Sequence, residues 1–112
     1  MFFDGNFSHA IHKGPLLQRG ARVEVNGLFA PERIEARAPS EVELELGKRV
    51  IAAIPFSTPL YARVDMVDPG HDPHQSTEPM LLELEVAEPS CFLDTDPGAA
   101  ARFARAIERQ LA

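Results

Sequence analysis

Two stretches in which apolar and polar residues alternate constrain the fold of this chain more than any other feature. They are residues 60–67 (LYARVDMV) and 80–87 (MLLELEVA). Successive side chains of a β-strand point to opposite faces of a sheet, so alternation with a period of two predicts two strands that each have one apolar face. Residues 68–79, with three prolines and one glycine, form a polar loop between them. We therefore expect the two strands to pair as neighbours.

In that pairing the apolar faces are Leu60, Ala62, Val64 and Met66 on the first strand and Met80, Leu82, Leu84 and Val86 on the second. The opposite face then gathers Asp65, Glu83 and Glu85, with Arg63 beside them. Carboxylates that converge on a rigid sheet repel one another unless a cation lies among them. Hard oxygen ligands suit Mg²⁺, especially when a phosphate supplies further oxygens. From the alternation alone, a solvated face of an antiparallel sheet is the more common interpretation.

The sequence of the N-terminal third of the chain predicts several short strands. Met1–Phe3 and Phe7–His12 flank Asp4-Gly5-Asn6, and Asp-Gly is a strong hairpin signal because glycine tolerates a positive φ. A further short strand is predicted at Arg22–Val25, before an Asn-Gly turn. Residues 28–39, bracketed by prolines, are expected to be irregular.

Two helices follow from capping signals. Ser40 and Glu43 form a capping box, which predicts a helix to about Ala53 that ends before Pro55. Asp96 as N-cap and the proline after it predict a second helix. The expected apolar stripes are Val42, Leu46, Val50 and Ile54 on the first helix, and Ala100, Phe103, Ala104, Ile107 and Leu111 on the second. The element order predicts an α+β fold, a mainly antiparallel sheet with both helices packed on one face.

Composition narrows the class of protein. A chain of 112 residues and 12.3 kDa forms one domain, residues 1–112. Its net charge of −6 and pI near 5.1 argue against a nucleic-acid surface. One cysteine, Cys91, excludes an internal disulfide, and no stretch has the length of a membrane span or the pattern of a signal peptide. We expect a soluble, cytoplasmic domain that binds neither nucleic acid nor a membrane.

Three segments together resemble a known family. Residues 3–15 (FDGNFSHAIHKGP), 61–65 (YARVD) and 82–90 (LELEVAEPS) are similar, in that order, to the C-terminal part of ATP-grasp carboxylate–amine ligases. The resemblance is to the glutathione-synthetase-like and D-cycloserine cyclo-ligase-like subgroup. Such enzymes use Mg²⁺ and ATP to phosphorylate a carboxylate, which an amine then attacks. The resemblance implies the fold of that C-terminal subdomain, incomplete in this chain.

The resemblance also implies roles for individual residues. Asp65 and Glu83 fall where the family has Mg²⁺-binding carboxylates. Glu85 falls where the family usually has asparagine as a further metal ligand, so this chain carries one more negative charge there. Arg63 would lie beside the phosphates of ATP or organise the carboxylates, as a catalytic and cofactor-binding residue.

Three further positions can be compared with the family pattern. Lys13 falls where a cation is expected near the phosphate, which implies a catalytic and ATP-binding role. His12 stands where many relatives have arginine, so this chain departs from the pattern there. Ser90 falls on the loop that follows the metal-binding strand, which looks like part of the acceptor-substrate loop, and the resemblance places it among the cofactor-binding residues.

The resemblance does not extend to a nucleotide-binding lid or an N-terminal substrate domain. We therefore expect no ligase activity from this chain alone, and a fragment, a truncated reading frame and a standalone domain all remain open. The alternative function is a non-catalytic domain that self-associates. In either case we expect a homodimer, formed through the N-terminal hairpin with Phe2, Phe3 and Phe7.

Other candidate sites are less favoured. His9 and His12 lie three residues apart, and on a strand they would point to opposite faces, so they are poorly placed to chelate a metal. His71 and His74 lie in a proline-rich loop, where solvated side chains are expected. Cys91 is interpreted as a small buried apolar residue rather than a nucleophile.

Overall fold

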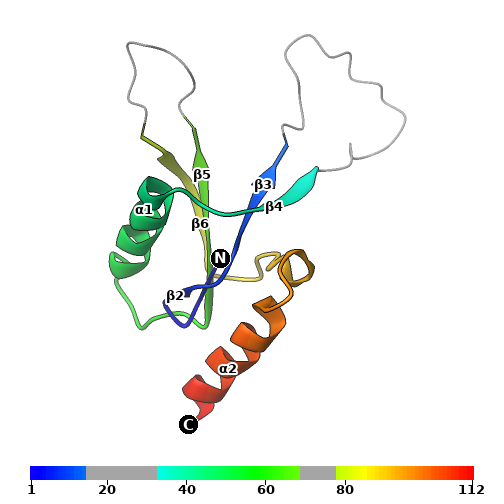
Figure 1. The fold of residues 1–112 in the computed structure, drawn as a ribbon. Coiled ribbons are helices and arrows are strands. Elements are labelled where there is room, and N and C mark those ends of the chain that lie inside the picture. The colour runs from blue at the N-terminus through cyan, green and yellow to red at the C-terminus, as the bar shows by residue number, and fades with distance from the viewer. Residues whose placement is uncertain (15–32, 69–77) are drawn as a thin grey trace, which may run out of the picture.

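The computed structural model describes residues 1–14, 33–68 and 78–112 (Figure 1). It has a four-stranded antiparallel sheet in the order β2-β1-β5-β6 and a separate two-stranded sheet, β3-β4. The α+β class with an antiparallel sheet and two helices is confirmed. The elements are β1 (Phe2–Phe3), β2 (Asn6–Phe7), β3 (Ala10–Lys13), β4 (Ile34–Arg37), α1 (Glu41–Ala52), β5 (Tyr61–Val67), β6 (Met80–Glu85), the 3₁₀ turn η1 (Leu93–Thr95) and α2 (Ala99–Leu111).

Strands β5 and β6 pair antiparallel, as their alternation predicted. Arg63 lies opposite Glu85, and Asp65 lies opposite Glu83. The register then shifts, because Met66 pairs with Leu81 and Val67 with Met80, which leaves Leu82 without a partner. This β-bulge moves Met80 to the opposite face from Leu84, so the predicted single face of Met80, Leu82 and Leu84 is wrong.

The predicted N-terminal hairpin is confirmed in its turn but not in its second strand. Asp4 and Gly5 both have positive φ, +49° and +75°, which suits a tight two-residue turn between β1 and β2. The chain leaves this sheet at Ser8, and β3 instead pairs with β4. Strand β4 lies within residues 28–39, which we expected to be irregular, and a partner distant in sequence explains the difference. The strand predicted at Arg22–Val25 lies outside the described residues.

Helix α1 begins and ends where its capping signals predicted. The Glu43 amide donates to the Ser40 hydroxyl, and the Glu43 carboxylate accepts from the Ser40 amide, so the capping box is formed. Gly47 is the buried residue of this helix, and a Cβ there would lie 2.9 Å from the ring of Phe2. Val42, by contrast, is 52% exposed, so the predicted stripe is only partly buried.

Helix α2 begins later and turns a different face to the core than predicted. Its N-cap is Gly98, and the Asp96 carboxylate accepts from the Gly98 amide just before the helix. The buried residues are Ala99 and Ala106, with Phe103 partly buried beside them. The predicted stripe is rotated by about one position from this buried face. Its other residues are exposed: Ala100, Ala104, Ile107 and Leu111.

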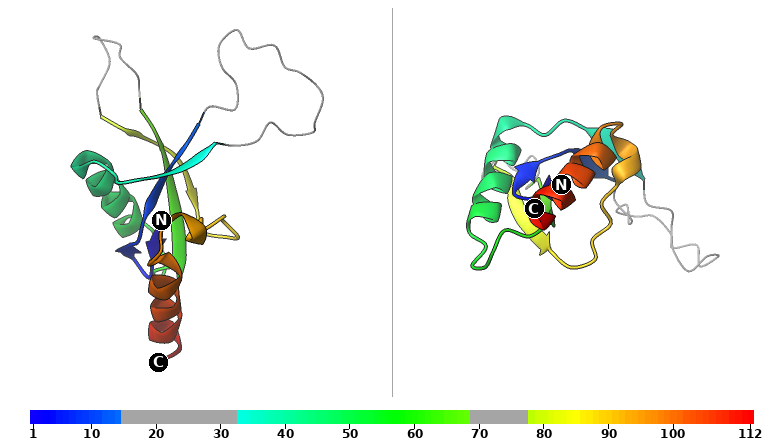
Figure 2. Two further views of the ribbon diagram at one scale, coloured as in Figure 1. Left: turned by 45° about the vertical axis from the view of Figure 1, so that its right-hand side comes forward. Right: turned by 90° about the horizontal axis from the view of Figure 1, so that it is seen from below.

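Figure 2 shows α1 and α2 on different sides of the strands, and each helix packs against a different side chain of β1. Phe2 contacts α1 at Gly47, whereas the ring of Phe3 lies 4.8 Å from that of Phe103 on α2. Adjacent strand residues point in opposite directions, so the expectation of both helices on one face is not met. Phe2 and Phe3 are 4% and 2% exposed, which places them in the core rather than at a free surface for dimerisation. No helix in the described parts of the chain has the length and apolar character to span a membrane.

Candidate functional site

The carboxylates of Asp65, Glu83 and Glu85 lie together on one face of β5 and β6. Asp65 is directly opposite Glu83, and Glu85 lies two residues further along β6, on the same face. One oxygen from each of the three can be chosen so that all lie within 4.8 Å of one another. Glu83 is exposed, and the other two are half-buried. The structure therefore shows the juxtaposition that the alternation predicted.

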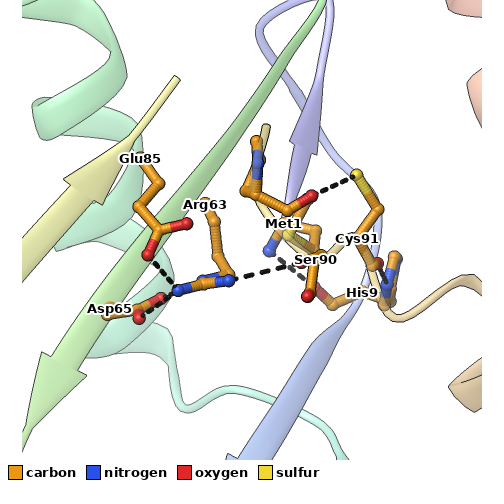
Figure 3. A network of polar contacts seen from close by, with 8 residues as sticks. Met1, His9, Arg63, Asp65, Glu85, Ser90 and Cys91 are labelled. Carbon is orange, nitrogen blue, oxygen red and sulfur yellow. Dashed lines mark hydrogen bonds and ion pairs between the residues drawn. The ribbon is translucent and has the colours of Figure 1, made fainter. Parts of the chain in front are cut away.

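Arg63 is the counter-charge of this cluster (Figure 3). Its Nε and Nη2 donate to the two oxygens of Asp65 at 2.8 and 3.0 Å, and Nη2 also donates to Glu85. Arg63 is 9% exposed. Its burial disfavours the charged form, but the hydrogen bonds to Asp65 and the charges of the carboxylates outweigh this effect and raise the pKa of the guanidinium.

The segment after β6 returns to the cluster. The Ser90 carbonyl accepts from Nη1 of Arg63 at 3.5 Å, and the Ser90 side chain itself is exposed. Phe92 follows with a φ of +47°, an unusual value for a residue with a large side chain. Its ring lies 5.9 Å from Cζ of Arg63 and 5.5 Å from Nζ of Lys13, within the range of cation–π contacts. Phe92 thus connects the two basic residues that the resemblance assigned to the phosphate.

A second group of hydrogen bonds surrounds His9, which is 4% exposed. Its Nε2 lies 2.9 Å from the Cys91 carbonyl and its Nδ1 lies 2.8 Å from the Ser8 hydroxyl. Burial lowers the pKa of His9. The amino group of Met1 donates to the His9 carbonyl at 2.8 Å, and its burial lowers its pKa to about 6. None of these contacts was predicted, because the partners are separated by many residues or lack a periodic signal.

The sequence also singled out the histidines, Cys91 and Lys13. His12 is exposed on β3, so the two N-terminal histidines occupy different environments, while His71 and His74 lie outside the described residues. Cys91 is half-buried against the core, and burial raises the pKa of its thiol, which agrees with its interpretation as a packing residue. No side-chain hydrogen bond to Lys13 is observed within the described ranges, and its contact is with the ring of Phe92.

The donor set fits a divalent cation. Every candidate ligand is a carboxylate oxygen, the type that Mg²⁺ prefers. Three carboxylates and one guanidinium leave a formal charge of −2, which one divalent ion would balance. Two of the carboxylates are already hydrogen-bonded to Arg63, so a metal ion would have to share them with the guanidinium or displace it. Glu83 has the most accessible oxygens for a first contact.

The fold of this chain is similar to part of a larger protein. No protein-family model matches the chain. The cycloserine biosynthesis protein DcsG of Streptomyces lavendulae is 37% identical over 115 aligned positions, which cover 98% of this chain and 36% of that protein. The crystal structure of the D-cycloserine synthetase DcsG superposes with a TM-score of 0.76 and 36% identity, over 99% of this chain and 36% of that one. The chain therefore spans about a third of the length of the relative it matches.

Proposed function

We propose that this chain forms the Mg²⁺- and phosphate-binding part of an ATP-grasp carboxylate–amine ligase. The observation that carries the proposal is the cluster of Asp65, Glu83 and Glu85, with ligand atoms within 4.8 Å of one another and with Arg63 bound to two of them. The similarity to a D-cycloserine synthetase across nearly the whole chain supports the same proposal.

Each residue has a distinct part in this proposal. The three carboxylates would hold Mg²⁺, which would neutralise part of the negative charge of the phosphates. Arg63 orients Asp65 and Glu85 from a buried position and keeps its own charge at all physiological pH values. Lys13, near the same aromatic ring, contributes a second positive charge on the side of the phosphate. Ser90 places an exposed hydroxyl at the edge of this group.

Catalysis is proposed to require more than this module. The relative is almost three times as long as the matched region, and phosphoryl transfer depends on holding both substrates in a fixed geometry. We expect the purified chain to bind Mg²⁺ with nucleotide but to show no ATP-dependent ligation. ADP release that depends on an amino acid and is abolished by Glu83→Gln would contradict this expectation.

Calorimetric titration tests the proposed binding. Wild-type chain should bind ADP in the presence of Mg²⁺ and lose at least about tenfold in affinity with Glu83→Gln, because the substitution removes a full ligand charge. Glu45→Gln is the matched control, since Glu45 is an exposed acid on α1 outside the cluster. Equal affinities for all three proteins, or no binding by the wild type, would refute the proposal.

The alternative of a self-associating domain is favoured by one observation. The edge strand β6 exposes apolar side chains at Met80, Leu81 and Leu82, which are 50%, 47% and 65% exposed. An exposed apolar edge strand is a common site of pairing between chains. Under this alternative a homodimer would form through β6 rather than through the N-terminal hairpin, and light scattering of Leu82→Lys against wild type would show a loss of the dimer.

A further inference from the structure

His9 holds the segment Pro89–Phe92 by a hydrogen bond whose direction is fixed (Figure 3). A carbonyl oxygen only accepts, so Nε2 of His9 must carry the proton and donate to the Cys91 carbonyl at 2.9 Å. In the neutral imidazole Nδ1 then accepts from the Ser8 hydroxyl at 2.8 Å. The imidazole therefore has both ring nitrogens engaged and one tautomer selected.

The same chain of hydrogen bonds extends to α2. The Ser8 oxygen accepts from Nε of Arg102 at 2.9 Å, and Arg102 is itself paired with Asp96. The donors and acceptors follow one order: Arg102 donates to Ser8, Ser8 donates to His9, and His9 donates to the segment. Because the orientation of the imidazole is set from both sides, it can act as a rigid support for the Cys91 peptide.

Within the segment Pro89–Phe92, the backbone of Phe92 has an unfavourable conformation. Phe92 has φ and ψ of +47° and +44°, which lie in the left-handed region and are unfavourable for a residue other than glycine. Two of the other bonds to the segment are longer, with 3.5 Å from Arg63 to the Ser90 carbonyl and 3.6 Å from the Cys91 thiol to the Pro89 carbonyl. The Thr95 hydroxyl donates to the Phe92 carbonyl at 2.8 Å, but it lies only three residues further along the chain. The bond from His9 is therefore the shortest side-chain hydrogen bond that ties this segment to a distant part of the fold, among the described residues.

The conformation of Phe92 matters because of where it places the ring. The ring lies near both Lys13 and Arg63, at 5.5 and 5.9 Å. Arg63 in turn fixes Asp65 and Glu85. Relaxation of Phe92 to a negative φ would move its ring away from both cations and remove one wall against which Arg63 is held.

We propose that His9 is a positioning residue for the phosphate site, acting through the Cys91 carbonyl to keep Phe92 against Lys13 and Arg63. The proposal rests on the proposed function of that site, and it assigns His9 no contact with metal, nucleotide or substrate. It also gives the pair of N-terminal histidines different roles, since His12 is exposed on β3.

The test compares His9→Leu, His9→Gln and the matched control His12→Leu by NMR and by titration. The Thr95 amide donates to the Phe92 carbonyl, so its hydrogen exchange reports the order of the segment without any ligand. In His9→Leu this exchange should accelerate about tenfold or more, and the nuclear Overhauser contact between the Phe92 ring and Lys13 should disappear. The affinity for ADP with Mg²⁺ should fall by about the same factor.

His9→Gln retains an amide donor that can reach the Cys91 carbonyl, so it should recover most of the loss, and His12→Leu should match the wild type. If His9→Leu does not fold, Ser8→Ala removes one side of the support and should give a smaller change of the same kind. Wild-type exchange at Thr95 in His9→Leu, or a disordered segment with unchanged nucleotide affinity, would overturn the proposal. If the wild type binds no nucleotide, the proposed function fails, while the measurements without ligand still decide whether His9 holds the segment.

Discussion

Replacing Arg63 with methionine should destabilise the protein and at the same time strengthen its binding of Mg²⁺. The Arg63 side chain is 11% exposed and its guanidinium bonds to the carboxylates of side chains that are 19% and 27% exposed, so its loss leaves partly desolvated charges without this partner. Breaking a buried pair costs about 3–5 kcal/mol, and the remaining exposure of the carboxylates reduces the expected loss in free energy of unfolding to about 2–4 kcal/mol.

The effect of the metal follows from the same charges. At an effective dielectric constant of about 20, two unit charges 4.8 Å apart repel by about 3.5 kcal/mol. Without Arg63 an added cation relieves more of this repulsion, so the affinity for Mg²⁺ should rise at least about tenfold. A Mg²⁺ concentration 100 times the dissociation constant would then restore about 2.7 kcal/mol.

Urea unfolding with and without MgCl₂ measures both effects. Arg33→Met is the matched control, because Arg33 is 80% exposed and its pairing with Glu35 contributes little. The reasoning is refuted if Arg63→Met loses no more stability than Arg33→Met. It is also refuted if Mg²⁺ stabilises the wild type and Arg63→Met equally.

Three further predictions concern other parts of the fold. Gly47→Ala should destabilise the protein by about 1 kcal/mol net, because the clash with the buried ring of Phe2 outweighs the gain of about 1 kcal/mol in helix propensity. Thermal unfolding, with Lys48→Ala as the control, measures this loss, and a stabilised Gly47→Ala variant would contradict the prediction. Ser40→Ala should cost about 1 kcal/mol by removing the cap of α1, measured by urea unfolding, and a loss below about 0.3 kcal/mol would mean that the cap is dispensable. Burial lowers the pKa of His9 in the folded state below its ordinary 6.5, so its contribution to stability is complete above pH 6.5 and is lost as the pH falls through the lowered value. The buried Met1 amine, with its pKa lowered to about 6, titrates in the same range. The quantity to compare is therefore the difference in free energy of unfolding between wild type and His9→Gln, measured from pH 8 to 5. Parallel curves for the two proteins would refute the role of His9.

The strand pair that carries the carboxylates was predictable because its signal is local. Alternation with a period of two determines which residues of β5 and β6 share a face, wherever the pair lies in the molecule. The bulge at Leu82 was not predictable, because a register shift depends on how two strands fit together and leaves no periodic mark in either one. Glu83 and Glu85 pair with Asp65 and Arg63 in one uninterrupted register, on one side of the bulge. Their juxtaposition with Asp65 was therefore predicted correctly.

The burial of α2 could not be predicted from its composition. Alanines lie on several faces of the helix, so two stripes about one position apart have similar apolar character. Contacts from distant residues select between them, since Arg102 reaches Ser8 and Arg109 reaches Asp4, and both turn Ala106 toward the core. Strand β4 was missed for a related reason, because four residues become a strand only beside β3.

The role of His9 also depends on tertiary structure. Its partner at Cys91 is 82 residues away, and nothing in the sequence near either residue indicates the contact. A buried histidine with a fixed tautomer is recognisable only once the fold brings a carbonyl and a hydroxyl to its two nitrogens.

The position of a bound divalent cation tests the central claim most directly. Mn²⁺ can replace Mg²⁺ as a paramagnetic probe, and it broadens the amide signals of residues close to it. We predict that substoichiometric Mn²⁺ broadens the signals of residues 63–66 and 83–86 first, and that Glu83→Gln removes this selectivity. An equally acidic groove, lined by Glu41, Glu45 and Glu78, lies between α1 and the start of β6. Broadening centred on that groove, with residues 63–66 unaffected, would contradict the assignment of the metal site to Asp65, Glu83 and Glu85.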